Sequence, residues 1–138
     1  MLLVDSTVWV DYFNGVLSAE TEHLDRAMAR EPVLIGDIIL AEVLQGFRED
    51  RDFSRALTAL SRFPQAQMLT PALAIESAQN YRRLRKQGIT VRKTIDCFIA
   101  TFAIVAGHDL LHSDRDFDPF ETHLGLRVVH PEYPVREG

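Results

Sequence analysis

Three aspartates occupy alternate positions in the stretch LLHSDRDFDPF, near the carboxyl end of the chain. They are Asp114, Asp116 and Asp118, and their spacing matches the first ligand positions of a calcium-binding EF-hand loop. The rest of that loop is missing, because its sixth position is Pro119 instead of glycine and its twelfth is Gly125 instead of glutamate. The role of these carboxylates therefore depends on acidic residues elsewhere in the chain.

Three further carboxylates stand at places that suit a partly buried site. Asp5 directly follows the apolar run LLV, so it lies at the end of a predicted strand. Glu42 falls at the edge of the apolar stripe of a predicted helix instead of opposite that stripe. Asp96 lies in the first turn of the most apolar helix, within TIDCFIATFAI, where an unpaired carboxylate is costly to bury. We therefore expect a positive charge beside Asp96.

Short apolar strands and helices alternate along the chain. We predict strands at residues 1–4, 33–36, 65–69, 109–113 and 126–130. We predict helices at residues 6–13, 20–29, 38–47, 52–62, 71–86 and 94–106, the first capped by Ser6 and Thr7 and the last buried at the centre. This order predicts one α/β domain with a parallel β-sheet flanked by helices on both faces.

The predicted sheet gathers the acids at one place, because ligands of such sheets bind outside the carboxyl ends of the strands. Taken singly, each acid fits an ordinary role as a helix cap, a boundary residue or part of a polar loop. Together at one edge they would repel one another unless a cation binds. Oxygen ligands favour Mg²⁺ or Mn²⁺ over Zn²⁺, and no histidine pair here has metal-binding spacing.

The composition fits a globular protein. The chain has 138 residues, of which 46% are hydrophobic and 25% charged, with a formal net charge of −5. This acidic balance argues against binding nucleic acid through overall charge. The longest apolar run, FIATFAIVAG, falls short of the ~18 residues of a membrane-spanning helix, and the N-terminus lacks the basic start of a signal peptide. The single cysteine, Cys97, excludes an internal disulfide and fits a reducing cytoplasm, so we expect a cytoplasmic protein without membrane association.

The order of the acidic motifs resembles the PIN-domain ribonucleases, and most closely the VapC toxins of bacterial toxin–antitoxin pairs. The motifs that carry this resemblance are VDSTVWVDYF, DIILAEVLQGF, TIDCFIATFAI and LLHSDRDFDPF. They extend over nearly the whole chain. The resemblance implies a PIN-like three-layer fold, which we place at residues 1–132, with residues 133–138 as a C-terminal tail.

The resemblance also implies an activity and a set of partners. The activity would be that of an endoribonuclease that depends on Mg²⁺ or Mn²⁺ and cleaves structured cellular RNA of the tRNA or rRNA class. The implied catalytic acids are Asp5, Glu42, Asp96, Asp114 and Asp116. Metal ligation is implied for Asp5, Asp96 and Asp114, with Asp116 as the alternative fourth acid, and a supporting hydroxyl comes from Ser6 or Thr7. The implied partners are a second copy of the chain and an inhibitory VapB-type antitoxin.

An acidic site needs cations nearby to hold RNA, and the densest basic stretch is NYRRLRKQGITVRK, just before the Asp96 helix. We predict RNA contacts from Arg82, Arg85, Lys86, Arg92 and Lys93. The alternative is a solvated helix face whose charges are paired with their neighbours. The resemblance also implies a groove that takes an antitoxin helix, which we place at the apolar residues Trp9, Val10, Phe13 and Phe47 near the expected site. Aromatic residues at this helical spacing are more often part of the core or of a dimer contact.

Other classes of protein fit less well. A haloacid-dehalogenase-like phosphatase needs a second aspartate two positions after the first, where this chain has Thr7. That class and the response-regulator receivers also need a lysine near the later acids, and no lysine follows Lys93. A non-catalytic partner-binding or regulatory domain with the PIN fold stays open as the alternative function, and metal-dependent RNA cleavage distinguishes it from a nuclease.

Overall fold

A four-stranded parallel sheet forms the centre of the molecule, whose computed structural model describes residues 1–132. Its strands are β1 (Leu2–Val4), β2 (Val33–Gly36), β3 (Gln65–Ala66) and β4 (Asp109–Leu111). Their spatial order is β3-β2-β1-β4, so β1 pairs with β2 on one side and with β4 on the other. The chain moves in one direction from β1 to β3 and then crosses back to the opposite edge to form β4.

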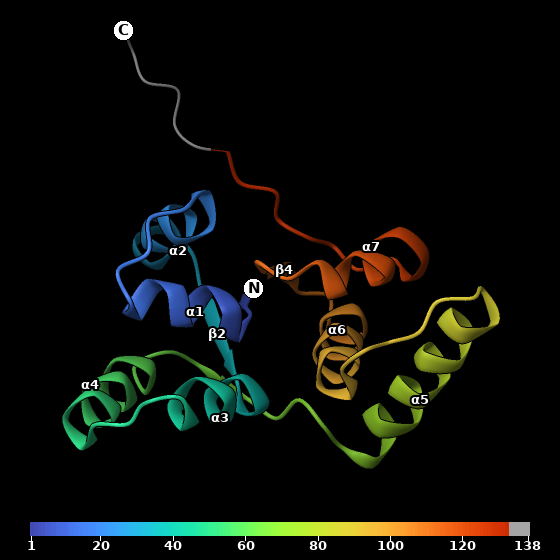
Figure 1. Cartoon of the computed structure of the whole chain (residues 1–138), viewed down its shortest axis with the longest axis horizontal. Helices are drawn as coiled ribbons and strands as arrows, with labels where there is room; N and C mark the ends of the chain where they lie inside the picture. The colour runs from blue at the N-terminus through green and yellow to red at the C-terminus, as the bar shows by residue number, and fades with distance from the viewer. Residues whose placement is uncertain (133–138) are drawn as a thin grey trace, which may run out of the picture.

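Helices cover both faces of this sheet. Within residues 1–132 they are α1 (Ser6–Phe13), α2 (Ala19–Arg30), α3 (Asp37–Gln45), α4 (Asp50–Leu60), α5 (Pro71–Lys86), α6 (Thr94–Ala106) and α7 (Asp118–Leu124), with a 3₁₀ turn η1 (Arg115–Phe117). Because crossovers between parallel strands are right-handed, reversing direction along a sheet moves the helices to its other face. Figure 1 shows α1 to α4 on one side of the strands and α6, backed by α5, on the other. The predicted three-layer α/β fold is confirmed.

Burial explains why such short strands form. Every residue of β1 and β2 is buried, as expected of parallel strands covered on both faces. The prediction that residues 94–106 form the central buried helix is confirmed, since Ile99 and Ala100 of α6 are completely enclosed. The buried side-chain amide of Asn80 on α5 donates a hydrogen bond of 3.0 Å to the Thr101 hydroxyl on α6. The two helices are thereby joined by a satisfied polar pair.

The start of α1 differs in detail from its prediction. The residue that caps the helix is Asp5, whose Oδ2 accepts the backbone N–H of Thr7 at 3.1 Å. The prediction of a cap at Ser6 and Thr7 was wrong, because both residues lie within the helix. Asp5 is therefore held at the junction between β1 and α1 by its own helix.

The segment after β4 holds the main error of the sequence analysis. Residues 126–130, predicted as a strand, form only one bridge, between Leu110 and Val128. η1 and α7 intervene and bury Phe117 and Phe120 in the core, and the chain then returns beside β4 to pair with Leu110 alone. The strand predicted at 65–69 shortens to two residues, and the predicted tail at 133–138 lies outside the described residues. No helix in the described part of the chain is long and apolar enough to cross a membrane.

Candidate active site

The acidic residues gather at the carboxyl ends of β1 and β4. This is the point where the chain leaves β1 for one edge of the sheet and later arrives at β4 on the other, which is where open parallel sheets bind ligands. Asp5 follows β1 and Asp114 follows β4, while Asp96 comes from the first turn of α6. Glu42 lies on α3, and its Oε1 accepts a hydrogen bond from Ser6 beside Asp5. The sheet thus brings together acids from four separate segments of the sequence.

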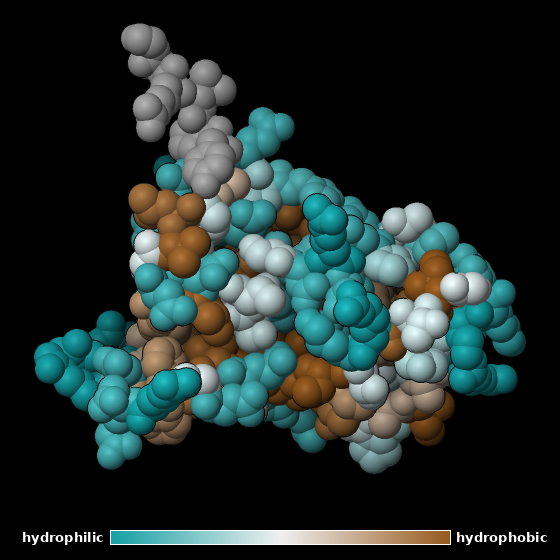
Figure 2. All heavy atoms as spheres, in the orientation of Figure 1, coloured by the Kyte–Doolittle hydropathy of each residue, from teal (hydrophilic) through white to brown (hydrophobic). Residues whose placement is uncertain are grey.

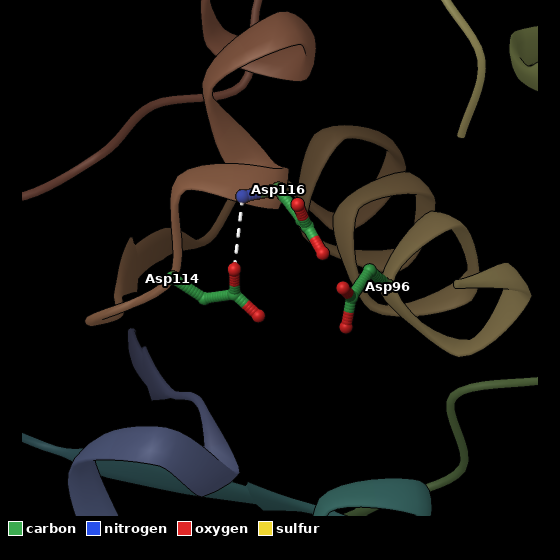
Figure 3. Close-up of side chains that lie close together, drawn as sticks. All are labelled: Asp96, Asp114 and Asp116. Atoms are coloured by element: carbon green, nitrogen blue, oxygen red, sulfur yellow. Dashed lines mark hydrogen bonds between the residues drawn. The ribbon is translucent and has the colours of Figure 1, made fainter. Parts of the chain in front are cut away.

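Three of these acids form a compact cluster, which we call the carboxylate trio. Asp96, Asp114 and Asp116 each place one oxygen within 4.8 Å of the others. Figure 3 shows Asp96 on α6 facing the turn after β4 that carries the other two, and the backbone N–H of Asp116 donates a 2.9 Å hydrogen bond to Asp114 Oδ1. The sequence left Asp114 and Asp116 as alternatives, whereas the structure places both in the trio. Asp5 lies outside it.

A lysine stands among these carboxylates. The Nζ atom of Lys93 lies 2.8 Å from Asp114 Oδ2, 3.6 Å from Asp116 Oδ2 and 3.7 Å from Asp96 Oδ2. Lys93 is the N-cap residue of α6, three positions before Asp96. The expected positive charge beside Asp96 is therefore present. Sequence reasoning had assigned Lys93 to the basic stretch and missed this position, although the i, i+3 spacing to Asp96 was a usable signal.

The pKa values of Asp96 and Asp114 are shifted in opposite directions. Asp96 is only 5% exposed, and burial raises its pKa to about 7, with Lys93 opposing the shift and the charges of Asp5, Asp114 and Glu42 adding to it. Burial acts the same way on Asp114, but the hydrogen bonds from Lys93 and from the Asp116 backbone outweigh it and lower its pKa. Asp96 Oδ2 is buried and has no hydrogen-bond partner within the described residues. Within the trio, Asp96 is thus the acid whose ionised form an added cation would stabilise most.

Asp5 is fixed in place by Thr7. The Thr7 hydroxyl donates a hydrogen bond of 2.6 Å to Asp5 Oδ2 and accepts one of 3.1 Å from the backbone N–H of Ser113. Asp5 is 2% exposed, and this burial raises its pKa against the lowering effect of the bonds from Thr7. Thr7 therefore connects the end of β1 to the loop that follows β4.

Glu42 occupies the α3 side of the site. Its Oε1 accepts a hydrogen bond of 3.2 Å from the Ser6 hydroxyl. Partial burial and then the nearby charge of Asp5 raise the pKa of Glu42, while Ser6 and Lys93 lower it. The two hydroxyls that the sequence analysis named thus contact different acids, Ser6 contacting Glu42 and Thr7 contacting Asp5.

His112 falls within the strand predicted at residues 109–113. It lies just past β4, and its Nδ1 accepts the backbone N–H of Asp114 at 3.0 Å. Its ring packs 4.9 Å from that of Phe117, and burial lowers its pKa, so the neutral imidazole is favoured. His112 therefore helps to shape the turn that carries Asp114, a role that the sequence pattern did not indicate.

The trio suits a hard divalent cation. Its donors are carboxylate oxygens from three residues, which are the ligands that Mg²⁺ and Mn²⁺ prefer. The buried Asp96 oxygen without a hydrogen bond is the feature that such an ion would satisfy. The residues present therefore fit a Mg²⁺ or Mn²⁺ ion.

The basic stretch divides into two parts. On α5, Arg82 bonds Gln79, Arg83 pairs with Glu76 and Asn80, and Arg85 stacks over the Tyr81 ring. The cationic end of α5 lies at the outer edge of the molecule, where Figure 2 shows hydrophilic side chains. Arg92 and Lys93 instead precede α6, and Lys93 reaches the trio.

Comparison with known proteins identifies the family of this chain. Residues 2–121 match the PIN domain family. The ribonuclease VapC11 of Mycobacterium tuberculosis is 31% identical over 131 residues, which cover 94% of this chain and 98% of the relative. The chain therefore belongs to the PIN-domain family, in the branch of the VapC ribonucleases.

Solved structures share the fold. VapBC2 from Rickettsia felis, bound to a DNA fragment from its promoter, matches with a TM-score of 0.75 and 17% identity, covering 93% of this chain and 96% of that one. VapC20 of Mycobacterium tuberculosis, described as a Sarcin-Ricin loop cleaving toxin, matches with a TM-score of 0.62 and 18% identity, covering 86% and 93%. At sequence identities of 17% and 18%, the structural similarity shows a shared fold and nothing more.

Proposed function

We propose that this protein is an endoribonuclease that depends on Mg²⁺ or Mn²⁺ and acts as the toxin of a toxin–antitoxin pair. The observation that carries the proposal is the carboxylate trio at the carboxyl edge of the sheet, with its buried, unbonded Asp96 oxygen. Membership among the VapC ribonucleases supports the choice of RNA as substrate. The proposed catalytic acids are Asp5, Glu42 and the trio.

Each part of the site has a proposed task. Asp96, Asp114 and Asp116 would hold the ion, and Asp5, whose charge acts on Asp96, would add to the negative potential of the site. A bound Mg²⁺ or Mn²⁺ would supply Lewis-acid polarisation of the scissile phosphate and lower the pKa of a bound water. Glu42, whose Oε1 accepts the hydrogen bond from Ser6, would orient the attacking water and accept its proton through the other oxygen. Its raised pKa suits a proton acceptor.

The proposed substrate is structured RNA of the tRNA or rRNA class. VapC20, which shares the fold, is described as cleaving the Sarcin-Ricin loop. The residues proposed to contact the RNA backbone are Arg82, Arg85, Lys86, Arg92 and Lys93. The cations of α5 would bind phosphates beyond the scissile bond, because they lie at the outer edge of the molecule.

The proposed partners are a VapB-type antitoxin and a second copy of the chain, and the proposed compartment is the cytoplasm. The antitoxin groove inferred from the sequence needs one revision, because Trp9 is 1% exposed and belongs to the core. Val10 remains exposed and borders a hollow of about 410 Å³ beside Glu42. An antitoxin side chain in this hollow would reach Glu42 directly.

RNA cleavage by matched variants tests the catalytic proposal. We expect the purified protein to cleave total RNA when Mg²⁺ or Mn²⁺ is present. Cleavage should cease when a chelator removes the ion. Asp116→Asn should remove the cleavage, whereas Asp118→Asn makes the same charge change on the exposed start of α7 and should keep it. A protein that leaves RNA intact with either ion would be a non-catalytic domain.

Co-expression tests the partner proposal. A small protein encoded next to this chain should co-elute with it in size-exclusion chromatography and suppress the cleavage. Sedimentation of the purified chain should give the mass of a dimer. Separate elution at micromolar concentration, or a monomer mass, would contradict the corresponding proposal.

A further inference from the structure

Lys93 forms the closest ion pair in the carboxylate trio. Its ammonium nitrogen is at hydrogen-bonding distance from Asp114 only, at 2.8 Å, and stands 3.6–3.7 Å from the oxygens of Asp116 and Asp96. Those two distances are too long for good hydrogen bonds. A single lysine nitrogen therefore offsets only part of the negative charge of the trio and satisfies one of its three carboxylates well.

A divalent ion would need the same oxygens. Mg²⁺ and Mn²⁺ bind carboxylates at about 2.1 Å, much closer than the lysine nitrogen approaches Asp96 or Asp116. Two cations sharing these oxygens would repel each other at short range. Occupation by the ammonium and occupation by the ion are therefore competing states of one site.

The lysine is able to leave without a change in the fold. Its side chain is 57% exposed, whereas that of Asp96 is 7% exposed. Four flexible methylene groups join the ammonium to the backbone ahead of α6. The acids are thus fixed by the fold and the counter-ion is tethered.

We propose that Lys93 is an intramolecular competitor for the divalent ion, which occupies the trio in the metal-free protein and is displaced when the ion binds. This inference rests on the proposed metal site. It assigns Lys93 a role in setting metal affinity that is separate from contact with RNA. The displaced ammonium stays tethered at the rim of the site, where a phosphate of the substrate is its natural new partner.

Metal affinity measured without RNA tests this competition. Mn²⁺ binding is followed by calorimetry or by electron paramagnetic resonance for the wild type, Lys93→Met and Lys93→Gln. Removing the competitor should tighten Mn²⁺ binding roughly tenfold, equivalent to about 1.4 kcal/mol. Arg115→Met is the matched control, because Arg115 lies between Asp114 and Asp116 in the chain but forms no ion pair within residues 1–132. Its loss should change the affinity by no more than about twofold, as expected for a screened surface charge.

The outcomes separate the inference from the proposed function. If the wild type binds no Mn²⁺, the metal site and the inference both fail. If the wild type binds Mn²⁺ and Asp96→Asn removes that binding, but neither Lys93 variant binds more tightly than Arg115→Met, the inference alone is overturned. Weaker Mn²⁺ binding in the Lys93 variants would also overturn it, since the lysine would then support the ion.

Chemical labelling gives an independent measurement. The chain has only two lysines, Lys86 and Lys93, so acetylation at each can be followed by mass spectrometry with an internal reference. Lys86 lies exposed at the end of α5. Adding Mn²⁺ should increase labelling of Lys93 several-fold relative to Lys86, because the ammonium is released from the carboxylates. An unchanged ratio under saturating Mn²⁺ would contradict displacement.

Discussion

The Thr7 hydroxyl links two residues that are far apart in the sequence, donating a 2.6 Å hydrogen bond to Asp5 and accepting one from the Ser113 backbone. This single side chain holds the first acid and ties it to the loop that carries Asp114. The hydroxyl therefore organises the site as well as stabilising the fold.

Replacing Thr7 with valine should expose this dual role. The change leaves Asp5 and the Ser113 N–H each without one partner, so the free energy of unfolding should fall by about 1–3 kcal/mol. RNA cleavage should fall as well, because Asp5 is no longer oriented. Urea unfolding in a chelator and a cleavage assay measure the two effects. Thr7→Ser keeps the hydroxyl and is the control. If Thr7→Val matched Thr7→Ser in both stability and cleavage, the hydroxyl would have neither role.

Asp96→Asn should separate stability from activity. Cleavage with Mg²⁺ should drop by about 10²–10³-fold, because the ion loses its buried ligand and several kcal/mol of charge stabilisation. Without metal, the melting temperature should stay the same or rise, since like-charge repulsion with Asp5, Asp114 and Glu42 is removed. A purified, folded variant with wild-type cleavage would exclude Asp96 from the reaction.

The raised pKa of Asp96 predicts how the stability of the metal-free protein depends on pH. Between the ordinary carboxyl pKa of 3.8 and about 7, the folded protein holds a proton on Asp96 that the unfolded chain has lost. The free energy of unfolding should therefore decrease as the pH rises through this range, with a slope of at most about 1.4 kcal/mol per pH unit for one proton. Asp5 and Glu42, whose pKa values are also raised, act in the same direction.

Urea unfolding at several pH values in a chelator measures this slope. Asp96→Asn, which cannot titrate at this position, should show a smaller decrease between pH 4 and 7 than the wild type. Metal affinity should change in the opposite sense and increase as the pH rises through 7, because the ion binds the ionised carboxylate. Parallel stability curves for the two proteins would contradict the raised pKa.

The cations at the end of α5 should bind RNA through its phosphates. We expect Arg85→Ala combined with Lys86→Ala to weaken RNA binding. The slope of log affinity against log salt concentration should become shallower by roughly 0.7 for each lost contact. Filter binding across a salt series, with Ca²⁺ replacing Mg²⁺ to suppress cleavage, measures both quantities. Arg26→Ala combined with Arg30→Ala removes the same charge from α2, which Figure 1 places on the opposite side of the molecule from α5. If the two double variants weakened RNA binding equally, the effect would come from the loss of net charge and not from contacts made by α5.

The order of the acids was predictable because each one follows a strong local signal. A short apolar run that ends in an acid marks the end of a buried strand, which located Asp5 and the loop after β4. The parallel sheet then required these ends to meet. The position of Asp96 followed from the unusually apolar helix that surrounds it.

The misplaced features depend on contacts between distant segments. Residues 126–130 have a strand-like composition, but they pair with β4 only through the bridge between Leu110 and Val128, so no strand forms. The Lys93 contacts with Asp114 and Asp116 depend on how the start of α6 meets the turn after β4, which no local pattern encodes. Sequence periodicity describes one element at a time, whereas these contacts arise between elements.

The pairing of β1 with β4 also has a consequence for the order in which the protein is made. β4 and the turn that follows it leave the ribosome last among the elements of the site, more than a hundred residues after β1. Until then a nascent chain holds Asp5, Glu42 and Asp96 but neither Asp114 nor Asp116, and one edge of β1 has no partner strand. The acid cluster therefore forms only after β4 and the turn that follows it have been synthesised, so a nascent chain that stops before this turn lacks Asp114 and Asp116.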